Sequence, residues 1–366
     1  MKHAVLVLED GSTWIGVGFG AETKVFGEIV FNTGMVGYVQ SITDPSFFGQ
    51  IVCQTYPLIG NYGVGPTELE SHKPQIWGYI VSELCRKPSH YRSEKGLDEW
   101  LKKHNIPGIE GIDTRELTKT LRVKGTMLGI LEVSRDKIDE KKLKDEVASV
   151  EDPNTTDLVG HVTVHNRIKY SADSSSRLNV IVIDCGVKLN IIRSLLERGV
   201  NVIRVPAIWE TKQILSLNPD GILISNGPGD PKKAGYVIRS VKDIIKKRIP
   251  MMGICLGNQI LALALGGNTY KLKFGHRGQN HPVIDLDTGK SFITSQNHGF
   301  AVRPESLDSS ALRVTFRNGN DGTVEGISHR KFPIMGVQFH PEASPGPQDT
   351  SFLFDRFIRM VKEEKA

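Results

Sequence analysis

Residues 249–264 read IPMMGICLGNQILALA, and their pattern indicates the fold of the second half of the chain. Its first six residues form a short apolar run typical of a buried parallel strand, and its last five are apolar at helical spacing. A strand that enters a helix through Gly-x-Cys-x-Gly predicts a tight strand–turn–helix elbow. Cys255 then stands at the first turn of a helix, where free N–H groups and the helix dipole stabilise a thiolate.

The alternation of buried strand and amphipathic helix extends upstream of this elbow. Apolar runs at 179–184, 202–205 and 221–224 are separated by helical stripes. Such alternation predicts βαβ units and a doubly wound, mostly parallel sheet. Beyond about residue 290 strands follow one another without helices, which predicts an antiparallel extension and then a terminal helix at 349–363. The strands expected in this extension are 291–295, 312–317, 323–328 and 334–339.

The first 150 residues have a different pattern, rich in strands. Apolar runs at 4–8 and 13–19 flank Asp10-Gly11, a strong hairpin signal. A helix is expected from Asp113, because Asp113-Thr114-Arg115-Glu116 has the capping-box pattern. Further elements are expected as strands at 25–31, 50–54 and 76–82 and as a charged surface helix at 134–148.

These patterns predict two domains of different class. The first, at 1–150, is a β-rich α+β domain, and the second, at 178–366, is a doubly wound α/β domain. Residues 151–177 contain two polar, turn-forming clusters and are expected to be the linker between them.

Composition and charge exclude several classes of function. The 366 residues include 46 Lys+Arg and 41 Asp+Glu, a net charge of +5, and no basic cluster with interleaved aromatics indicates nucleic-acid binding. No apolar stretch approaches the roughly 18 residues of a membrane helix. The four scattered cysteines show no metal-ligand spacing, so they predict reduced thiols in a cytoplasmic protein without a metal site.

A nucleophilic cysteine needs a base, and the base needs an orienting partner. His340 ends the apolar run 334–339, and Glu342 follows two residues later. Because residues i and i+2 of an extended chain face the same side, both can point into one site. Alternatively, Cys255 is a buried structural thiol and His-x-Glu a surface coincidence. The glycines on both sides of Cys255, and the presence of this elbow together with the His-x-Glu pair in one chain, favour a Cys–His–Glu triad.

A Gly-rich and Pro-rich loop, SNGPGDP at 225–231, directly follows the run 221–224. It is expected at the same sheet edge as Cys255, where a rigid loop can bring backbone N–H groups close to a ligand. A plain β–α turn is the simpler reading, but it accounts less easily for all seven residues.

Eight stretches of this chain resemble a known family. SNGPGDP, GICLGNQ at 253–259, SQNHGF at 295–300 and FHPEASPGP at 339–347 resemble the class I (triad) glutamine amidotransferases. The chain is most similar to the small, glutamine-hydrolysing subunit of carbamoyl-phosphate synthase, through stretches that other amidotransferases lack. These are FGEIVFNTGMVGY at 26–38, TDPSFFGQIV at 43–52, TYPLIGNYG at 55–63 and GIDTRELT at 111–118.

The resemblance implies a role for individual residues. Cys255 is the nucleophile toward the side-chain amide of L-glutamine, His340 is the base and acid, and Glu342 holds the imidazole. The N–H groups of Leu256 and Gly229 form the oxyanion hole. Asn258 departs from the family pattern, which often has His there, but it lies outside the triad. The implied glutamine contacts are Ser46, Gly227, Gly229, Leu256, Gln259, Asn297, Gly299 and Phe300, and Ser46 makes the N-terminal domain part of the glutamine site.

The resemblance also implies a partner. In the family a separate large subunit binds ATP, its metal ions and bicarbonate, receives ammonia through a channel, and supplies carbamoyl phosphate for arginine and pyrimidine synthesis. Consistent with this, Gly289-Lys290-Ser291 mimics the end of a phosphate-binding loop, but Ile284 stands where its first glycine belongs. No cofactor is therefore expected in this chain, and the N-terminal domain is expected to dock the large subunit. The alternatives are another triad amidotransferase, of the anthranilate or GMP synthesis type, and a scaffold with a dead glutaminase site.

Overall fold

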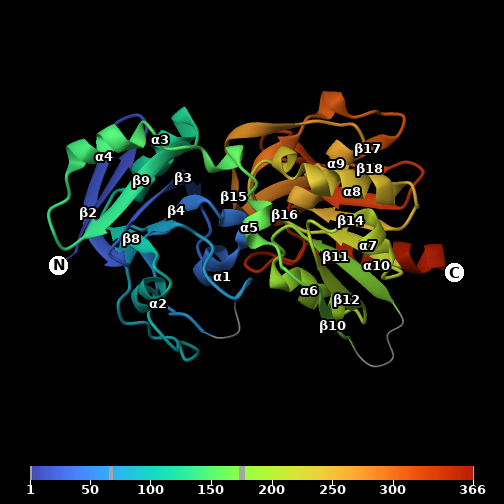
Figure 1. Ribbon diagram of the computed structural model, residues 1–366, viewed down its shortest axis with the longest axis horizontal. Helices are drawn as coiled ribbons and strands as arrows, with labels where there is room; N and C mark the ends of the chain where they lie inside the picture. Colours follow the sequence, from blue (N-terminus) through green and yellow to red (C-terminus); the bar gives the residue numbers. More distant parts are fainter. Residues whose placement is uncertain (1, 66–68, 173–177, 366) are drawn as a thin grey trace. The chain divides into compact units, whose positions relative to one another are not determined.

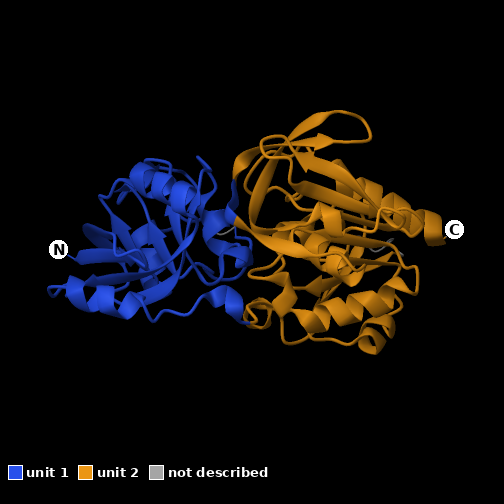
Figure 2. Cartoon of the chain, turned by 90° about the horizontal axis from the view of Figure 1, so that it is seen from above, with its two compact units in different colours: residues 1–156, 273–277 blue, residues 157–272, 278–366 orange. Residues whose placement is uncertain are grey.

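The computed structural model describes residues 2–65, 69–172 and 178–365. The chain divides into two compact units (Figure 2): unit 1 is Met1–Thr156 with Lys273–Arg277, and unit 2 is Asp157–Leu272 with Gly278–Ala366. The expected linker at 151–177 spans this division, and its residues 173–177 lie outside the described residues.

Several strands of unit 1 are labelled in Figure 1. They belong to a closed barrel whose strand order is β1-β2-β8-β6-β4-β3-β9. The hairpin around Asp10-Gly11 is confirmed, because β1 and β2 pair antiparallel. Closure comes from β9, which pairs antiparallel with both β1 and β3. The strands are β1 (His3–Leu8), β2 (Thr13–Gly20), β3 (Lys24–Asn32), β4 (Gln50–Gln54), β6 (Gly78–Ile80), β8 (Pro107–Glu110) and β9 (Met127–Ser134), with β5 (Leu58–Ile59) and β7 (Glu83–Leu84) as a separate pair.

Four neighbouring strands of the barrel, β3, β4, β6 and β8, run parallel. Alternate residues of six strands, such as Leu6, Ile29 and Ile109, form one apolar cluster, to which α3 adds Leu117 and Leu121. The predicted start of α3 is confirmed, because the Asp113 side chain caps it by accepting from Glu116 N. The helices of unit 1 are α1 (Tyr38–Thr43), α2 (Leu97–Lys103), α3 (Thr114–Lys124) and α4 (Glu140–Val147), with short 3₁₀ turns η1 (Pro45–Phe47) and η2 (Pro153–Thr155).

Unit 2 is built on a ten-stranded sheet in the order β10-β12-β11-β13-β14-β19-β18-β16-β15-β17. Its central strands β12, β11, β13, β14 and β19 are parallel, so the predicted doubly wound α/β class is confirmed. The strands are β10 (Ile168–Tyr170), β11 (Asn179–Asp184), β12 (Asn201–Pro206), β13 (Gly221–Ile224), β14 (Met251–Ile254), β15 (Thr269–Asp285), β16 (Ser291–Val302), β17 (Leu312–Asn318), β18 (Val324–His329) and β19 (Ile334–Val337).

One strand differs from the sequence-based expectation. The run 334–339 was expected in the antiparallel extension, whereas β19 pairs parallel with β14 and antiparallel with β18. It therefore joins the parallel core to the extension. This pairing places the residues that follow β19 beside the end of β14, where Cys255 lies.

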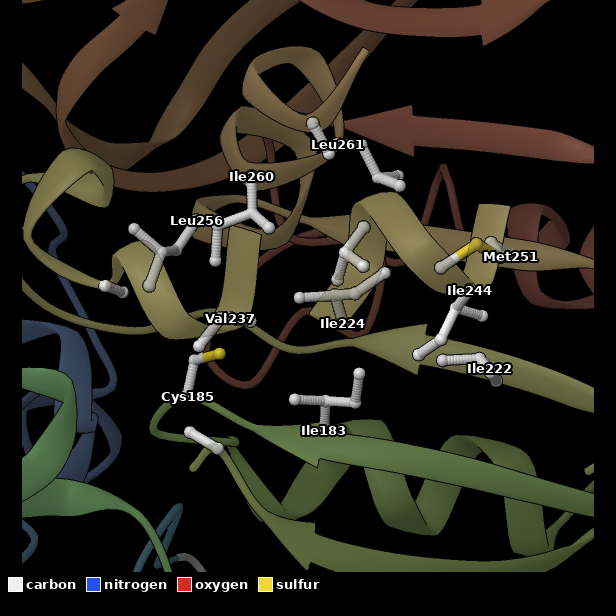
Figure 3. Packing of buried hydrophobic residues seen from close by; sticks show 14 of the residues in the cluster. Ile183, Cys185, Ile222, Ile224, Val237, Ile244, Met251, Leu256, Ile260 and Leu261 are labelled. Atoms are coloured by element: carbon white, nitrogen blue, oxygen red, sulfur yellow. The ribbon is translucent and has the colours of Figure 1, made fainter. Parts of the chain in front are cut away.

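Helices cover both faces of the sheet in unit 2. On one face Ile183, Ile222 and Ile224 pack with side chains of α8 and α9 (Figure 3). On the other, the cluster includes Ile191 of α6 and Phe357 of α10. Among the described helices none is long and apolar enough to span a membrane. The helices of unit 2 are α5 (Val159–Val162), α6 (Leu189–Leu196), α7 (Thr211–Leu215), α8 (Gly235–Ile245), α9 (Leu256–Ala264) and α10 (Phe352–Lys365), with η3 (Pro231–Lys233) and η4 (Pro304–Ser306).

Candidate active site

Cys255 occupies the turn between β14 and α9, as the residue directly before the helix. Its backbone has φ 54° and ψ −105°, a conformation that side-chain-bearing residues rarely adopt. The strain is held by neighbouring hydrogen bonds, because Cys255 N donates to Val337 O at 2.8 Å and Cys255 O accepts from Asn258 N at 3.1 Å. Such strain concentrates at functional sites, where surrounding structure stabilises it.

The two glycines around Cys255 allow the strand, the turn and the helix to approach closely. A Cβ at Gly253 would lie 2.5 Å from backbone atoms of Gly257, and a Cβ at Gly257 would lie 2.1 Å from Ile224 O. Neither position therefore has space for a side chain. The Gly-x-Cys-x-Gly pattern is a packing requirement of this elbow, and it positions the start of α9 against β13.

His340 and Glu342 come together just after β19. His340 N donates to Ser295 O at 2.9 Å, and His340 Nδ1 lies 2.6 Å from Glu342 Oε1. Both side chains are buried. Among the residues that the structure describes, His340 Nε2 has no hydrogen-bond partner. Since Glu342 occupies Nδ1, Nε2 is the nitrogen left to exchange a proton with a thiol or a substrate.

A buried lysine completes this group. Lys188 Nζ lies 3.0 Å from Glu342 Oε1 and donates to Ala343 O at 2.6 Å. The Lys188 side chain is only 3% exposed, so its charge needs the carboxylate as a partner. Its backbone N–H donates to Asn226 Oδ1 at 3.0 Å, which ties it to the loop after β13.

The loop that carries Lys188 is shaped by a second buried ion pair. Asp184 Oδ1, at the end of β11, accepts from Gly186 N at 3.0 Å and Val187 N at 2.8 Å. Its Oδ2 lies 2.7 Å from Arg204 Nη2. The Asp184 carboxylate therefore fixes the turn from β11 to α6, and with it the position of the Lys188 backbone.

The three charges act on one another. Burial raises the pKa of Glu342, but the Lys188 ammonium and the His340 imidazolium outweigh it and hold that pKa well below its usual range. Burial lowers the pKa of His340, whereas Glu342 and the neighbouring Cys255 raise it, and the net shift is upward. The ionised Glu342 carboxylate therefore stabilises the positive charge that the imidazole carries whenever it holds an additional proton.

One amide side chain and one backbone carbonyl lie next to the thiol. Cys255 Sγ lies 3.6 Å from Asn297 O and 3.7 Å from Gln338 Nε2. Gln259, in the first turn of α9, donates through Nε2 to Phe300 O at 2.8 Å and to Gln338 Oε1 at 3.1 Å. This network joins α9 to β16 and to the segment after β19.

Most of the binding residues inferred from sequence lie on three segments of unit 2. Gly227 and Gly229 are in the loop after β13, Leu256 and Gln259 begin α9, and the others follow one another on β16: Asn297, Gly299 and Phe300. The β13 loop abuts α9, since a Cβ at Gly227 would lie 2.8 Å from Leu256 Cδ2. Gly229 has φ 80°, which glycine adopts without strain. Leu256 is the first residue of α9, so its N–H has no acceptor within the helix.

Ser46 is the one inferred site residue that belongs to unit 1. It lies in η1, where its backbone N–H donates to Asp44 Oδ1 at 2.9 Å, and its side chain is buried. The roles assigned to Ser46 and to the other binding residues remain predictions.

Sequence reasoning missed Lys188 and Gln338. Lysine and glutamine are mostly exposed residues, so their burial is not predicted by residue type. One signal was present for Lys188, which follows the apolar run 179–184 at the carboxyl end of a predicted parallel strand, where ligand sites concentrate. For Gln338, inside the run Ile334–His340, the signal was a polar residue within a buried strand segment.

Taken together, this geometry suits nucleophilic acyl transfer. A strained cysteine at a helix start provides the nucleophile, and a buried His–Glu pair provides proton transfer. The N–H at the start of α9 has no acceptor within the helix, so it is available to stabilise an oxyanion at a carbonyl carbon attacked by Sγ. The site contains the parts of a thiol-dependent hydrolase or amidotransferase.

Each half of the chain matches the model of a known protein family. The family model described as glutamine amidotransferase class-I matches residues 181–360. The model described as carbamoyl-phosphate synthase small chain, CPSase domain, matches residues 6–131.

Curated relatives match along the whole length. A carbamoyl phosphate synthase small chain of Methanocaldococcus jannaschii is 52% identical over 361 residues, covering 98% of this chain and 99% of the relative. Another, of Archaeoglobus fulgidus, is 49% identical over 365 residues, again covering 98% and 99%. A third, of Bacillus cereus, is 49% identical over 360 residues and covers 98% and 96%. The match at 6–131 disfavours an amidotransferase of the anthranilate or GMP synthesis type.

Proposed function

The chain belongs to the carbamoyl phosphate synthase small-chain family, and from that premise we propose that it hydrolyses L-glutamine and passes the ammonia to a synthase partner. The observation that carries the proposal is the buried group formed by Cys255, His340 and Glu342. It is the arrangement that thioester chemistry requires, on a chain whose relatives match it from end to end.

The first half of the reaction forms a thioester. Cys255 gives its proton to His340, and Sγ attacks the side-chain amide carbon of glutamine, so that an Sγ–C bond forms and the carbonyl oxygen becomes an oxyanion. The N–H groups of Leu256 and Gly229 stabilise this charge. His340 then gives the proton to the amide nitrogen, the C–N bond breaks, and ammonia leaves.

The second half regenerates the thiol. His340 takes a proton from water, and the resulting hydroxide attacks the thioester carbon. The C–S bond breaks, glutamate leaves, and the proton returns from His340 to sulfur. Glu342 keeps the imidazole oriented and compensates its positive charge in both halves, which is the role of the third member of a triad.

The proposed partner is the large subunit of carbamoyl-phosphate synthase, which uses ATP, metal ions and bicarbonate to make carbamoyl phosphate for arginine and pyrimidine synthesis. Free ammonia at neutral pH is mostly protonated and non-nucleophilic, so direct transfer between docked subunits preserves its reactivity. We expect no cofactor in this chain, because the chemistry of glutamine hydrolysis needs only its own side chains. Its four cysteines stand as free thiols, which supports the proposed cytoplasmic location.

The test uses the complete chain with a purified large subunit. Cys255→Ser removes the nucleophile, so carbamoyl phosphate synthesis from glutamine should be lost while synthesis from added ammonium chloride continues. Glutamine-dependent synthesis at the wild-type rate in this variant would exclude the mechanism. Loss of synthesis from both nitrogen sources, with the complex intact, would contradict the separation of the two reactions between the subunits.

A further inference from the structure

Three sequence stretches that mark the N-terminal half contribute no residue to the inferred glutamine site, yet they meet in one hollow of unit 1. The hollow has a volume of about 620 Å³. The stretch 26–38 contributes Thr33, the stretch 55–63 contributes Thr55 and Pro57, and the stretch 111–118 contributes Arg115 and Thr118. Its volume is that of a small-molecule site.

The topology of the barrel explains why these segments meet. Thr33 directly follows β3, Thr55 directly follows β4, and Ser82 lies two residues after β6. These strands are parallel to one another and to β8, after which the chain enters α3. The hollow therefore lies at the carboxyl ends of four parallel strands, where α/β proteins commonly bind ligands.

One wall of the hollow is strongly basic. Arg115, Lys119 and Arg122 line it from α3, and their spacing places them on one face of the helix, opposite the buried Leu117 and Leu121. Within the described part of the chain, no acidic side chain pairs with Arg115 or Arg122. Lys119 Nζ lies 3.4 Å from Glu116 Oε2.

The start of α3 does not itself provide the anion site. The Asp113 carboxylate, which is itself part of the lining of the hollow, already caps this end and accepts from Glu116 N at 2.9 Å. Recognition therefore depends on side chains: two guanidinium groups, one ammonium group, and the hydroxyls of Thr55 and Ser82. Pro57 is the most apolar residue of the lining, whereas the centre of a protein–protein interface is rich in apolar and aromatic side chains.

We propose that this hollow binds a small phosphate-bearing ligand. Arginine guanidinium groups match phosphate oxygens in bidentate geometry. The donors that line the hollow outnumber what the two oxygens of a carboxylate accept, whereas a phosphate offers at least three oxygens and up to two negative charges. The site is separate from glutamine hydrolysis, whose substrate carries no phosphate, so its test is independent of that function.

The experiment titrates the full chain with inorganic phosphate and with pyrophosphate by calorimetry, at an ionic strength held constant with chloride. Thermal unfolding is followed under the same conditions, since a ligand that binds the folded state raises the unfolding temperature. We expect saturable binding that weakens by about tenfold or more in the double variant Arg115→Met, Arg122→Met. A second double variant, Arg115→Lys, Arg122→Lys, retains the charges and should bind with intermediate affinity.

The matched control is Lys141→Met with Lys144→Met, two exposed residues of α4 in the same unit. This control variant also loses two positive charges, but at positions outside the hollow. It should therefore bind phosphate like the unmodified chain. Absence of saturable binding to the unmodified chain would overturn the proposal, as would equal loss in the control. Loss of large-subunit assembly in the arginine variant, with no phosphate binding by the unmodified chain, would show that the hollow docks a protein instead.

Discussion

Replacing Lys188 by Met tests whether the buried ammonium stabilises the triad carboxylate. Lys188 Nζ lies 3.0 Å from Glu342 Oε1, and both side chains are at most 3% exposed. Breaking a buried ion pair costs about 3–5 kcal/mol, because one charge stays buried without its partner. Glu342 keeps His340 at 2.6 Å, so the lower end applies, about 3 kcal/mol. For a unit of about 200 residues, this lowers the unfolding temperature by roughly 6–12 °C.

The assay compares urea unfolding of Lys188→Met with that of a control, Lys247→Met, which removes an exposed lysine just after α8.

The pH dependence of the stability difference gives a second check. The folded-state pKa of Glu342 is lowered, so its ionisation contributes stability above the unfolded pKa that is lost as pH falls through the folded pKa. Without Lys188 that pKa rises, so the stability difference between variant and wild type should shrink as the pH falls from 7 toward the lowered pKa of the unmodified chain. A difference below about 0.5 kcal/mol from the control, or one independent of pH, would refute the reasoning.

The structure predicts the effects of three further substitutions. Glu342→Gln removes a main cause of the raised His340 pKa, so kcat should fall about a hundredfold or more and the basic limb of the glutaminase pH profile should move to lower pH; an unmoved limb would contradict this. Gly257→Ala places a Cβ 2.1 Å from Ile224 O and should destabilise the chain by about 3 kcal/mol in urea unfolding, whereas Gly96→Ala, with open space, should not. Ser46→Ala should raise the KM for glutamine with kcat less affected in steady-state assays, and the reverse pattern would exclude a binding role.

The elbow and the parallel sheet of unit 2 could be predicted from sequence because their signals are local. The run 249–254, the glycines around Cys255 and the apolar helix that follows each constrain a few neighbouring residues. His340 and Glu342 were paired by the two-residue period of an extended chain, and their side chains do meet. Signals of this kind need no knowledge of distant contacts.

Long-range features were not predictable in the same way. The barrel is continuous between β2 and β6 only through β8, which is four residues long and begins with a proline. The parallel pairing of β19 was missed because a buried apolar strand has the same local pattern in either direction. The contact between Lys188 and Glu342 joins residues far apart in sequence, and no periodicity indicates it.

Trapping the covalent intermediate tests directly whether Cys255 is the nucleophile. The chain, with its partner present, is mixed with labelled glutamine, quenched in acid within one turnover and digested for mass spectrometry. The account predicts a γ-glutamyl group on the peptide that contains Cys255, and none in Cys255→Ser. Ammonia release from glutamine with the label on another residue, or with no label bound to the chain, would contradict it.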